Sequence, residues 1–482
     1  MQVAARSRFA RLRRALAQND RFLSIRMLSS IAVYLVVAAS YLQARITDDG
    51  VIYYDFMRRL VGEDVDAYAY QFGVVFWNLP FYVLSRLVRV ANDDDRIEHV
   101  LIGALGVAVA STAAVVVLFY VSWRLIRALG LPGGPGAILL TVFGSPLYYS
   151  IFQTGLKHAF DTLLVSLLAL LLLHASGRPT TTRIAVALGL VAAVLITVRY
   201  ANIVLLTGVV YVFLRRRELS QAYVASATAI VAATAILAFP LLLGIPYGLP
   251  PAGTAAAGEP QGSGPALLGR EPGAPPPPAA FRLAADQPAA RPTSGGGVDN
   301  IGSFQLDFLA PAKMLFTVKR GLFVWTPLTL FGVIGYLLLL RREPRHRTFL
   351  VGLGLSALSL LLVHIVWGAF WAGGFSFSQR FLTALFPVFV IGIAELLART
   401  RMLVLPLLVA CVAWSAFLAL HHFYGYDQVS DRDGADRIIE LYRTGEEDSG
   451  SFWDERISGP VGRHWGAYFD WLGLSSRNRE AG

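Results

Sequence analysis

Two adjacent aspartates, Asp48 and Asp49, are the residues of this chain best placed for acid–base chemistry. They directly follow a long apolar run that extends from Met27 to Ile46. A carboxylate at the middle of a bilayer costs on the order of 3 kcal/mol, so the pair is expected at a membrane surface. At the outer surface, the pair is a candidate general base for chemistry on a lipid-anchored substrate. A solvated loop end that only reinforces the membrane orientation is the alternative.

Aromatic side chains suited to sugar binding follow the aspartates in the same predicted outer loop. Tyr53 and Tyr54 come first, and apolar positions with interleaved arginines over 74–90 predict an amphipathic helix that lies on the membrane. A second aromatic patch, 367–380, contains Trp371 among glycines that permit tight turns. Tyr53, Tyr54 and Trp371 are therefore candidates for sugar or acceptor binding. An aromatic belt with an anchoring arginine is the alternative for the second patch.

Cations are the third kind of candidate. The chain has only three lysines, and all of them fall at the predicted outer face. A G+C-rich genome explains why lysine is scarce, but outer cations run against the usual orientation bias. A phosphate at the membrane surface would supply the reason. The candidate phosphate-binding residues are Lys157, His158, Arg199, Lys319, Arg320 and Arg380. Ordinary interfacial or snorkelling side chains are the alternative for His158 and Arg199.

No pattern in the chain indicates a metal or a cofactor. His421 and His422 are adjacent rather than four residues apart, and they lack a glutamate partner. The chain contains no Walker-type phosphate loop, no GxGxxG and no GxSxG. The sequence therefore predicts no cofactor, and it leaves dependence on a divalent metal open.

The composition is that of a polytopic helical membrane protein. Hydrophobic residues make up 55% of the 482 positions and charged residues only 15%, against about 25% in soluble domains. The mean hydropathy is +0.55. The net charge of +10 does not indicate nucleic-acid binding, because the arginines cluster in short segments between apolar runs. The single cysteine, Cys411, permits no internal disulfide.

The apolar runs and arginine clusters together predict about eleven transmembrane helices, within a range of nine to twelve. Each even-numbered turn carries arginine, which places the N-terminus inside and the C-terminus outside. Residues 184–214 would span about 46 Å as one helix, which fits a bilayer core only with strong tilt. A single tilted helix is the alternative to two short spans broken near Arg199 and Tyr200, which we predict because they keep both flanking arginine clusters inside. The expected spans are 27–45, 99–122, 136–152, 159–175, 184–198, 200–214, 222–244, 320–340, 348–367, 381–398 and 402–420.

This topology divides the chain into five parts. The arginine-rich N-terminus is read as cytoplasmic, and the first span as an anchor that is retained rather than cleaved. The outer segment rich in Gly, Pro and Ala buries too little to fold by itself, so we expect a mobile insertion there. The parts are 1–26, a transmembrane module 27–244 with the outer loop 46–98, the outer loop 245–315, a second module 316–420 and the outer tail 421–482.

The order of several motifs resembles the GT-C integral-membrane glycosyltransferases, in the bacterial branch similar to protein mannosyltransferases and lipid A aminoarabinose transferases. The likeness covers roughly residues 30–400. Its motifs are the acidic pair with its tyrosine-rich loop, residues 144–149 with His158, residues 320–328, and residues 371–380 with Pro387.

The resemblance implies a helical GT-C-like fold in the bacterial cytoplasmic membrane. It implies a polyprenyl-phosphate-linked sugar donor and inverting transfer at the outer face to a hydroxyl of an envelope glycan, lipid or protein. An acid of the first-loop pair acts as base in that family, which here is Asp48 or Asp49. Family members often have Asp-Glu at this place, so which residue acts is open. The large folded outer domain of some members is missing, which leaves acceptor recognition open.

Two other function classes are compatible with the sequence. A transporter or lipid flippase needs no base, and it predicts charges along a path through the spans together with internal repeats. The chain shows few mid-span charges and no repeat. A non-catalytic binding protein of the same fold predicts donor binding without turnover, and sequence alone does not separate it from the enzyme.

Overall fold

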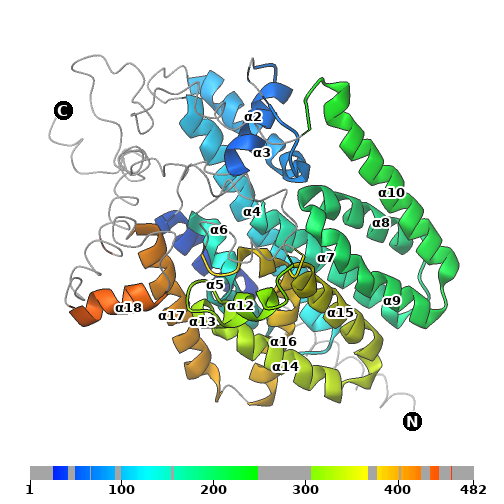
Figure 1. The fold of residues 1–482 in the computed structure, drawn as a ribbon, viewed down its shortest axis with the longest axis vertical. Helices are drawn as coiled ribbons and strands as arrows, with labels where there is room; N and C mark the ends of the chain where they lie inside the picture. The colour runs from blue at the N-terminus through cyan, green and yellow to red at the C-terminus, as the bar shows by residue number, and fades with distance from the viewer. Residues whose placement is uncertain are drawn as a thin grey trace, which may run out of the picture.

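The computed structural model describes residues 25–41, 49–63, 65, 67–92, 99–152, 157–247, 306–366, 377–400, 403–424, 435–444 and 458. The expected mobile insertion at 248–297, the N-terminal 24 residues and most of the tail lie outside this part of the chain. The described residues form helices, with one isolated bridge between Ala69 and Tyr247. Figure 1 shows the helices gathered into one bundle, with α2 and α3 at one end and the turn between α14 and α15 at the other.

The helices of the first half begin with the apolar helix Ile25–Tyr41. They continue with α2 (Asp49–Leu60), α3 (Gly73–Asn92), α4 (His99–Ala128), α5 (Gly134–Gly144), η1 (Pro146–Tyr148), α6 (Tyr149–Phe152), α7 (His158–Gly177), α8 (Thr182–Val198), η2 (Tyr200–Leu205), α9 (Leu206–Arg216) and α10 (Leu219–Leu242). The second half contains α12 (Ala310–Phe316), α13 (Leu322–Trp325), α14 (Leu328–Arg342), η4 (Pro344–His346), α15 (Arg347–Val363), η6 (Arg380–Leu385), α16 (Phe386–Arg399), α17 (Leu405–Tyr424) and α18 (Ala435–Thr444).

Six of the described helices are long and apolar enough to cross a membrane. They are residues 104–128 of α4, α7, α10, η4 with α15, η6 with α16, and residues 405–422 of α17. The α5 helix and the η1–α6 segment, bent by 71°, count as a seventh if they form one span. The helix Ile25–Tyr41 and α8 are apolar but shorter. The predicted helical architecture is confirmed, with six or seven helices among the described residues that could cross a membrane, and the count of about eleven spans stays a prediction.

The helix break predicted near Arg199 and Tyr200 is present. The α8 helix begins after Thr181, whose side chain accepts a hydrogen bond from the Ile184 N–H at 3.4 Å. It ends at Val198, because Arg199 takes an extended conformation (φ −157°, ψ 113°). The chain then continues as η2 and α9. Irregular backbone at membrane depth is tolerated where it is buried in protein, and the side chain of Arg199 is 5% exposed.

The amphipathic helix predicted over 74–90 is also present, as α3. Its inner face packs on α4, and the Trp77 indole N–H donates to the Ala110 carbonyl at 2.9 Å. On the opposite face Phe76, Leu84 and Leu87 are exposed. This apolar exposed face fits a helix in contact with lipid.

Some helices of the bundle cross closely at glycine residues. The α14 and α16 helices meet where a Cβ atom on Gly392 would overlap the carbonyl group of Gly332. Between spans in a bilayer there is no hydrophobic driving force, so close packing over small residues holds helices together. The α8 helix packs in a similar way on α10, since a Cβ atom on Gly189 would overlap the carbonyl of Ala225.

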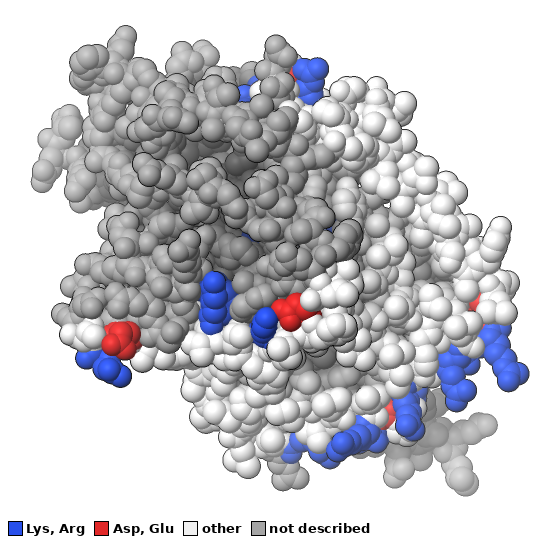
Figure 2. Space-filling model, in the orientation of Figure 1, with Lys and Arg blue, Asp and Glu red and all other residues white. Residues whose placement is uncertain are grey.

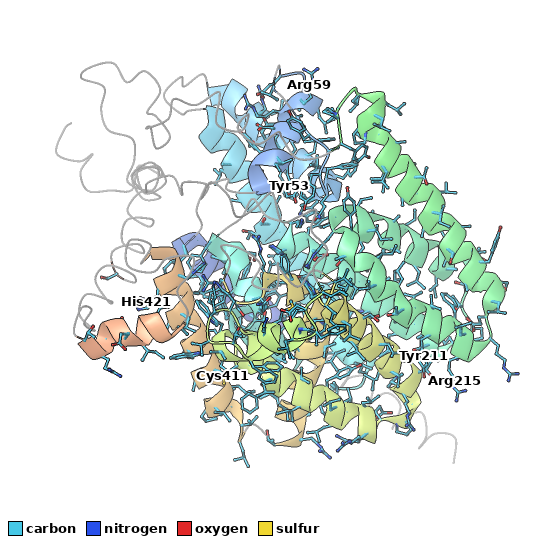
Figure 3. The ribbon with its side chains drawn as sticks, viewed as in Figure 1. Tyr53, Arg59, Tyr211, Arg215, Cys411 and His421 are labelled. Carbon is cyan, nitrogen blue, oxygen red and sulfur yellow. The ribbon has the colours of Figure 1, made fainter. Side chains whose placement is uncertain are left out.

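The arginines of the predicted inner turns lie along one rim of the molecule. Figure 2 shows blue side chains along its lower right edge, below α9, α14 and α15. The last turn of α9 carries Arg215 and Arg216, and the last turn of α14 carries Arg341 and Arg342. Figure 3 shows Arg215 at this rim and Arg59, on α2, at the opposite end. Basic clusters on one rim are the distribution that membrane orientation produces.

Candidate functional site

One residue of the predicted acidic pair, Asp49, belongs to α2, the helix that carries Tyr53. Asp49 is the first residue of α2, while its side chain, Asp48 and Trp371 lie outside the described part. Position 49 precedes Tyr53 by four residues, which is about one helical turn, so both positions share a helix face. The roles of Asp48, Asp49 and Trp371 stay predictions.

Tyr53 on α2 (Figure 3) holds Lys157, which lies just before α7. The Lys157 Nζ atom donates to the Tyr53 hydroxyl at 3.1 Å and to the Gln71 side-chain carbonyl. It also lies over two phenol rings, 5.8 Å from the centroid of Tyr53 and 5.6 Å from that of Tyr70. Lys157 is only 6% exposed. These contacts fix α2 and the segment after it to the start of α7, although Tyr53 and Lys157 are 104 residues apart.

Three further charged or titratable side chains lie near Lys157. His158, 3% exposed, interacts electrostatically with Arg380, Arg199 and Lys157. Arg199 donates to the Phe381 carbonyl at 2.7 Å, and its guanidinium lies 4.7 Å from the Phe381 ring centroid. Arg380 lies 5.7 Å from the same ring. We call Lys157, His158, Arg199 and Arg380 the cation cluster. It brings together four of the six predicted phosphate-binding residues.

A buried carboxylate adjoins this cluster. Asp161, in the first turn of α7, accepts a hydrogen bond of 2.6 Å from the side chain of Asn202. Asn202 also donates to the Leu195 carbonyl at 3.1 Å, and Asp161 interacts electrostatically with Arg199. Asp161 therefore helps to retain the charge of Arg199 in an apolar surrounding. The sequence reasoning missed Asn202, although a lone asparagine three residues after Arg199 in an apolar stretch was a usable signal.

Arg320 belongs to a second group. Its side chain is fully buried, donates to the Lys319 carbonyl at 2.8 Å and lies 4.9 Å from the Trp325 ring centroid. His422 lies edge-on to Trp325 at 6.0 Å, and Phe377 lies 5.4 Å from Trp325. We call Arg320, Trp325, Phe377 and His422 the arginine–tryptophan group. Lys319 is half-buried in the turn beside it. The segment 377–381 runs from this group to the cation cluster.

The side chain of Tyr54 makes different contacts from that of its neighbour Tyr53. Its ring meets Tyr82 edge-on at 5.4 Å, and the Tyr82 hydroxyl donates to Glu63 at 3.1 Å. Glu63 also pairs with Arg58 and Arg86, which joins the end of α2 to α3. Burial raises the pKa of the Tyr54 phenol, so this side chain stays neutral near pH 7. Tyr54 thus takes part in holding α2 on α3.

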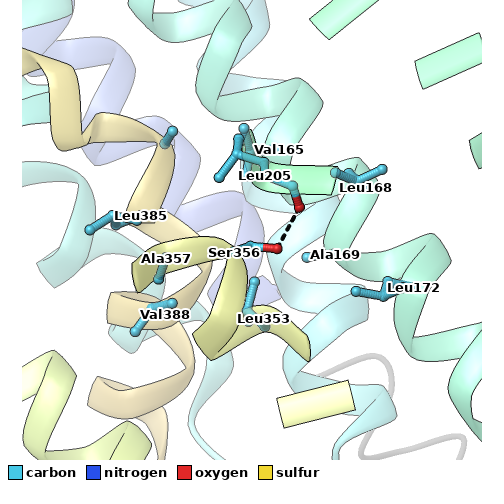
Figure 4. Close-up of a pocket in the computed structure, with 11 residues that line it drawn as sticks. Val165, Leu168, Ala169, Leu172, Leu205, Leu353, Ser356, Ala357, Leu385 and Val388 are labelled. Carbon is cyan, nitrogen blue, oxygen red and sulfur yellow. Dashed lines mark hydrogen bonds between the residues drawn. The ribbon is translucent and has the colours of Figure 1, made fainter. Parts of the chain in front are cut away.

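A narrow apolar pocket lies deeper in the bundle (Figure 4), with a volume of about 20 Å³. Its one polar side chain, Ser356, donates to the Leu205 carbonyl at 2.5 Å. The lining residues are Val165, Leu168, Ala169, Leu172, Leu205, Leu353, Ser356, Ala357, Ala384, Leu385 and Val388. They belong to α7, η2, α15, η6 and α16.

The pocket and the cation cluster share three elements. The α7 helix runs from His158 to Val165 and beyond, and η2 follows Arg199 and ends at the pocket residue Leu205. The η6 segment begins at Arg380 and ends at the pocket residue Leu385. Seven helical residues rise about 10 Å, so charged groups and apolar pocket follow each other along the same elements. This arrangement suits a ligand with an anionic head and an apolar tail.

No protein-family model, curated protein or solved structure matches this chain.

Proposed function

We propose that this protein is a membrane glycosyltransferase that moves a sugar from a polyprenyl-phosphate-linked donor to an acceptor hydroxyl at the outer face of the cytoplasmic membrane. The observation that supports the proposal most is the cation cluster at the start of the elements that line an apolar pocket. Cations bind phosphate by charge-assisted hydrogen bonds, and a polyprenyl tail needs an apolar path. At about 20 Å³ the pocket has room for about one water molecule, so the proposal requires α15 to part from α7 and α16 when the tail binds.

Different residues carry out the different parts of the sugar transfer. The acceptor oxygen attacks the anomeric carbon of the sugar, and the bond from that carbon to the phosphate oxygen breaks with its electron pair on the phosphate. Lys157, Arg199 and Arg380 stabilise the charge that develops on the leaving phosphate. Asp48 or Asp49 takes the acceptor proton. The position of residue 49, one turn before the Tyr53 that binds Lys157, supports a base close to the phosphate.

The proposal includes the GT-C-like architecture with about eleven spans. The N-terminus is then cytoplasmic, and the outer loops and the tail face the envelope. The acceptor is a hydroxyl of an envelope glycan, lipid or protein. The alternative of a non-catalytic binding protein predicts the same lipid binding with no transfer.

The test is transfer by purified protein in lipid nanodiscs from a panel of radiolabelled polyprenyl-phosphate hexoses and pentoses, with an envelope extract as acceptor. Unmodified protein is expected to transfer label from one donor of the panel. Asp48→Asn with Asp49→Asn is expected to lower turnover by a factor of about 100 or more, because general acid–base catalysis typically contributes about 100- to 10,000-fold. Asp307→Asn, another predicted outer-face aspartate, is the matched control. Unchanged turnover in the double variant would remove the proposed base.

A further inference from the structure

Gln379 is a fully buried amide whose hydrogen bonds are not made. Its side chain is 0% exposed, and neither Nε2 nor Oε1 has a hydrogen-bond partner in the part of the chain that the structure describes. Leaving one buried polar group unsatisfied costs about 1–3 kcal/mol, and most buried polar side chains are paired. A group that stays unpaired inside the protein therefore needs a ligand or another reason.

The position of Gln379 supplies such a reason. Two residues before it, Phe377 contacts Trp325 and lies 6.3 Å from His422 in the arginine–tryptophan group. Two residues after it, Phe381 contacts Arg199 of the cation cluster. Gln379 is thus the middle residue of the segment that connects the two groups.

The backbone beside Gln379 is unusual as well. Ser378, fully buried, has φ +52°, in the left-handed region that residues other than glycine seldom adopt. Such a conformation costs of order 1 kcal/mol or more, and it persists where the surrounding structure enforces it, often at ligand sites. An enforced backbone and an unsatisfied amide therefore occur at adjacent residues.

We propose that Gln379 binds a hydroxyl of the sugar that the donor phosphate carries, an inference that rests on the proposed function. A primary amide offers both donors and an acceptor, and a hydroxyl accepts one hydrogen bond and donates another. An ionised phosphate only accepts, so it would leave Oε1 unsatisfied. The phosphate lies against the cation cluster, and the sugar next to it reaches the neutral amide. Gln379 is then a specificity-determining residue.

The experiment compares two probes on the same purified protein, undecaprenyl phosphate without sugar and the undecaprenyl-phosphoryl sugar that the unmodified protein binds most tightly. Gln379→Met keeps a side chain of similar length and removes both hydrogen-bonding groups. The variant is expected to bind the sugar-bearing lipid about tenfold more weakly, because one hydrogen bond is lost. Its affinity for sugar-free undecaprenyl phosphate should be unchanged. Gln221→Met, on α10, is the control.

Thermal unfolding without ligand separates this role from a structural one. Removing an unsatisfied buried amide is expected to leave Tm unchanged or to raise it. A fall in Tm would show that Gln379 holds the fold or a buried water, and it would overturn the inference. Equal affinities of variant and unmodified protein for the sugar-bearing lipid would overturn it too, while the proposed function stands. If the unmodified protein binds neither probe, the proposed function fails and this inference fails with it.

Discussion

Within the cation cluster, the side chain of Lys157 is held by several neighbouring polar and aromatic side chains. Its Nζ atom contacts Tyr53, Tyr70 and Gln71, so the ammonium is fixed in place before a phosphate arrives. Pre-positioned cations are worth about 100-fold or more in rate when charge develops against them. We therefore expect Lys157→Met to lower the turnover of donor by about that factor, measured with purified protein at saturating acceptor.

Lys313→Met is the matched control, because Lys313 pairs with Asp307 and is 38% exposed. Its turnover should stay within about twofold of the unmodified protein, as for most exposed sites. A Lys157→Met protein that turns over normally would place the phosphate elsewhere.

The sequence identified the members of the cation cluster only as single candidates. Arg199 was visible because it interrupts an apolar stretch, and His158 because it follows Lys157 in the short turn between two predicted spans. Their partners were not visible, since Arg199 meets Phe381 across 182 residues and Lys157 meets Tyr53 across 104. The structure puts Arg380 beside Arg199 and puts Arg320 beside Trp325.

Among the elements, the crossing of α14 and α16 depends on glycine. A methyl group on Gly392 would overlap the Gly332 carbonyl, and backbone atoms cannot move aside as a flexible side chain can. We expect Gly392→Ala to destabilise the protein by about 1–3 kcal/mol, the usual range for overpacking. Gly354→Ala is the control, because its nearest neighbour would be the Tyr336 hydroxyl at 3.4 Å. Thermal unfolding followed by size-exclusion fluorescence measures both, and equal Tm values would contradict the close crossing.

The short α12 helix should be sensitive to acid. Lys313 donates to Asp307 at 2.6 Å, and the Leu309 N–H donates to the same carboxylate at 2.9 Å. The hydrogen bond from Lys313 holds the pKa of Asp307 below its ordinary value of 3.8. A lowered folded-state pKa stabilises the protein above the unfolded-state value, and this contribution is lost as pH falls through the folded-state value.

Amide-exchange protection of α12 should therefore hold from pH 6 to about 5 and fall as the pH is lowered below about 4, through the folded-state pKa. In Asp307→Asn it should already be low and change less with pH, because the titrating group is gone. Hydrogen exchange read by mass spectrometry gives both profiles. Parallel profiles for the two proteins would show that the ion pair does not hold α12.

The positions of helices could be predicted from the sequence more readily than the contacts between them. The break before η2 and the amphipathic α3 follow from local patterns, namely a helix too long for the bilayer and alternating apolar and basic positions. The bend of 71° between α5 and α6 was not expected, since the run 136–152 was read as one span. Nothing in local periodicity fixes where Ser145 and Pro146 turn the chain.

At the scale of the whole molecule, the arginines along one rim predict which loops lie on the same side of the membrane. Cys411 is the only cysteine and is 7% exposed, so a Cys411→Ser chain gives a clean background for labelling. Leu306→Cys, at a position 69% exposed, should react with a membrane-impermeant maleimide in intact spheroplasts. Arg345→Cys, in the turn between α14 and α15, should react only after permeabilisation. Labelling of both from the same side would refute the proposed orientation.

Because two phenol rings enclose Lys157, the reactivity of its amine can be used to measure the motion of α2. Its amine is shielded as long as Tyr53 of α2 stays in contact with it, whereas Lys313 and Lys319 are partly open to water. Slow acetylation by a small anhydride, followed for each lysine-containing peptide by mass spectrometry, then measures this motion. The acetylation rates of Lys313 and Lys319 serve as the internal reference. The lower rate expected at Lys157 then gives the frequency with which α2 moves away from it.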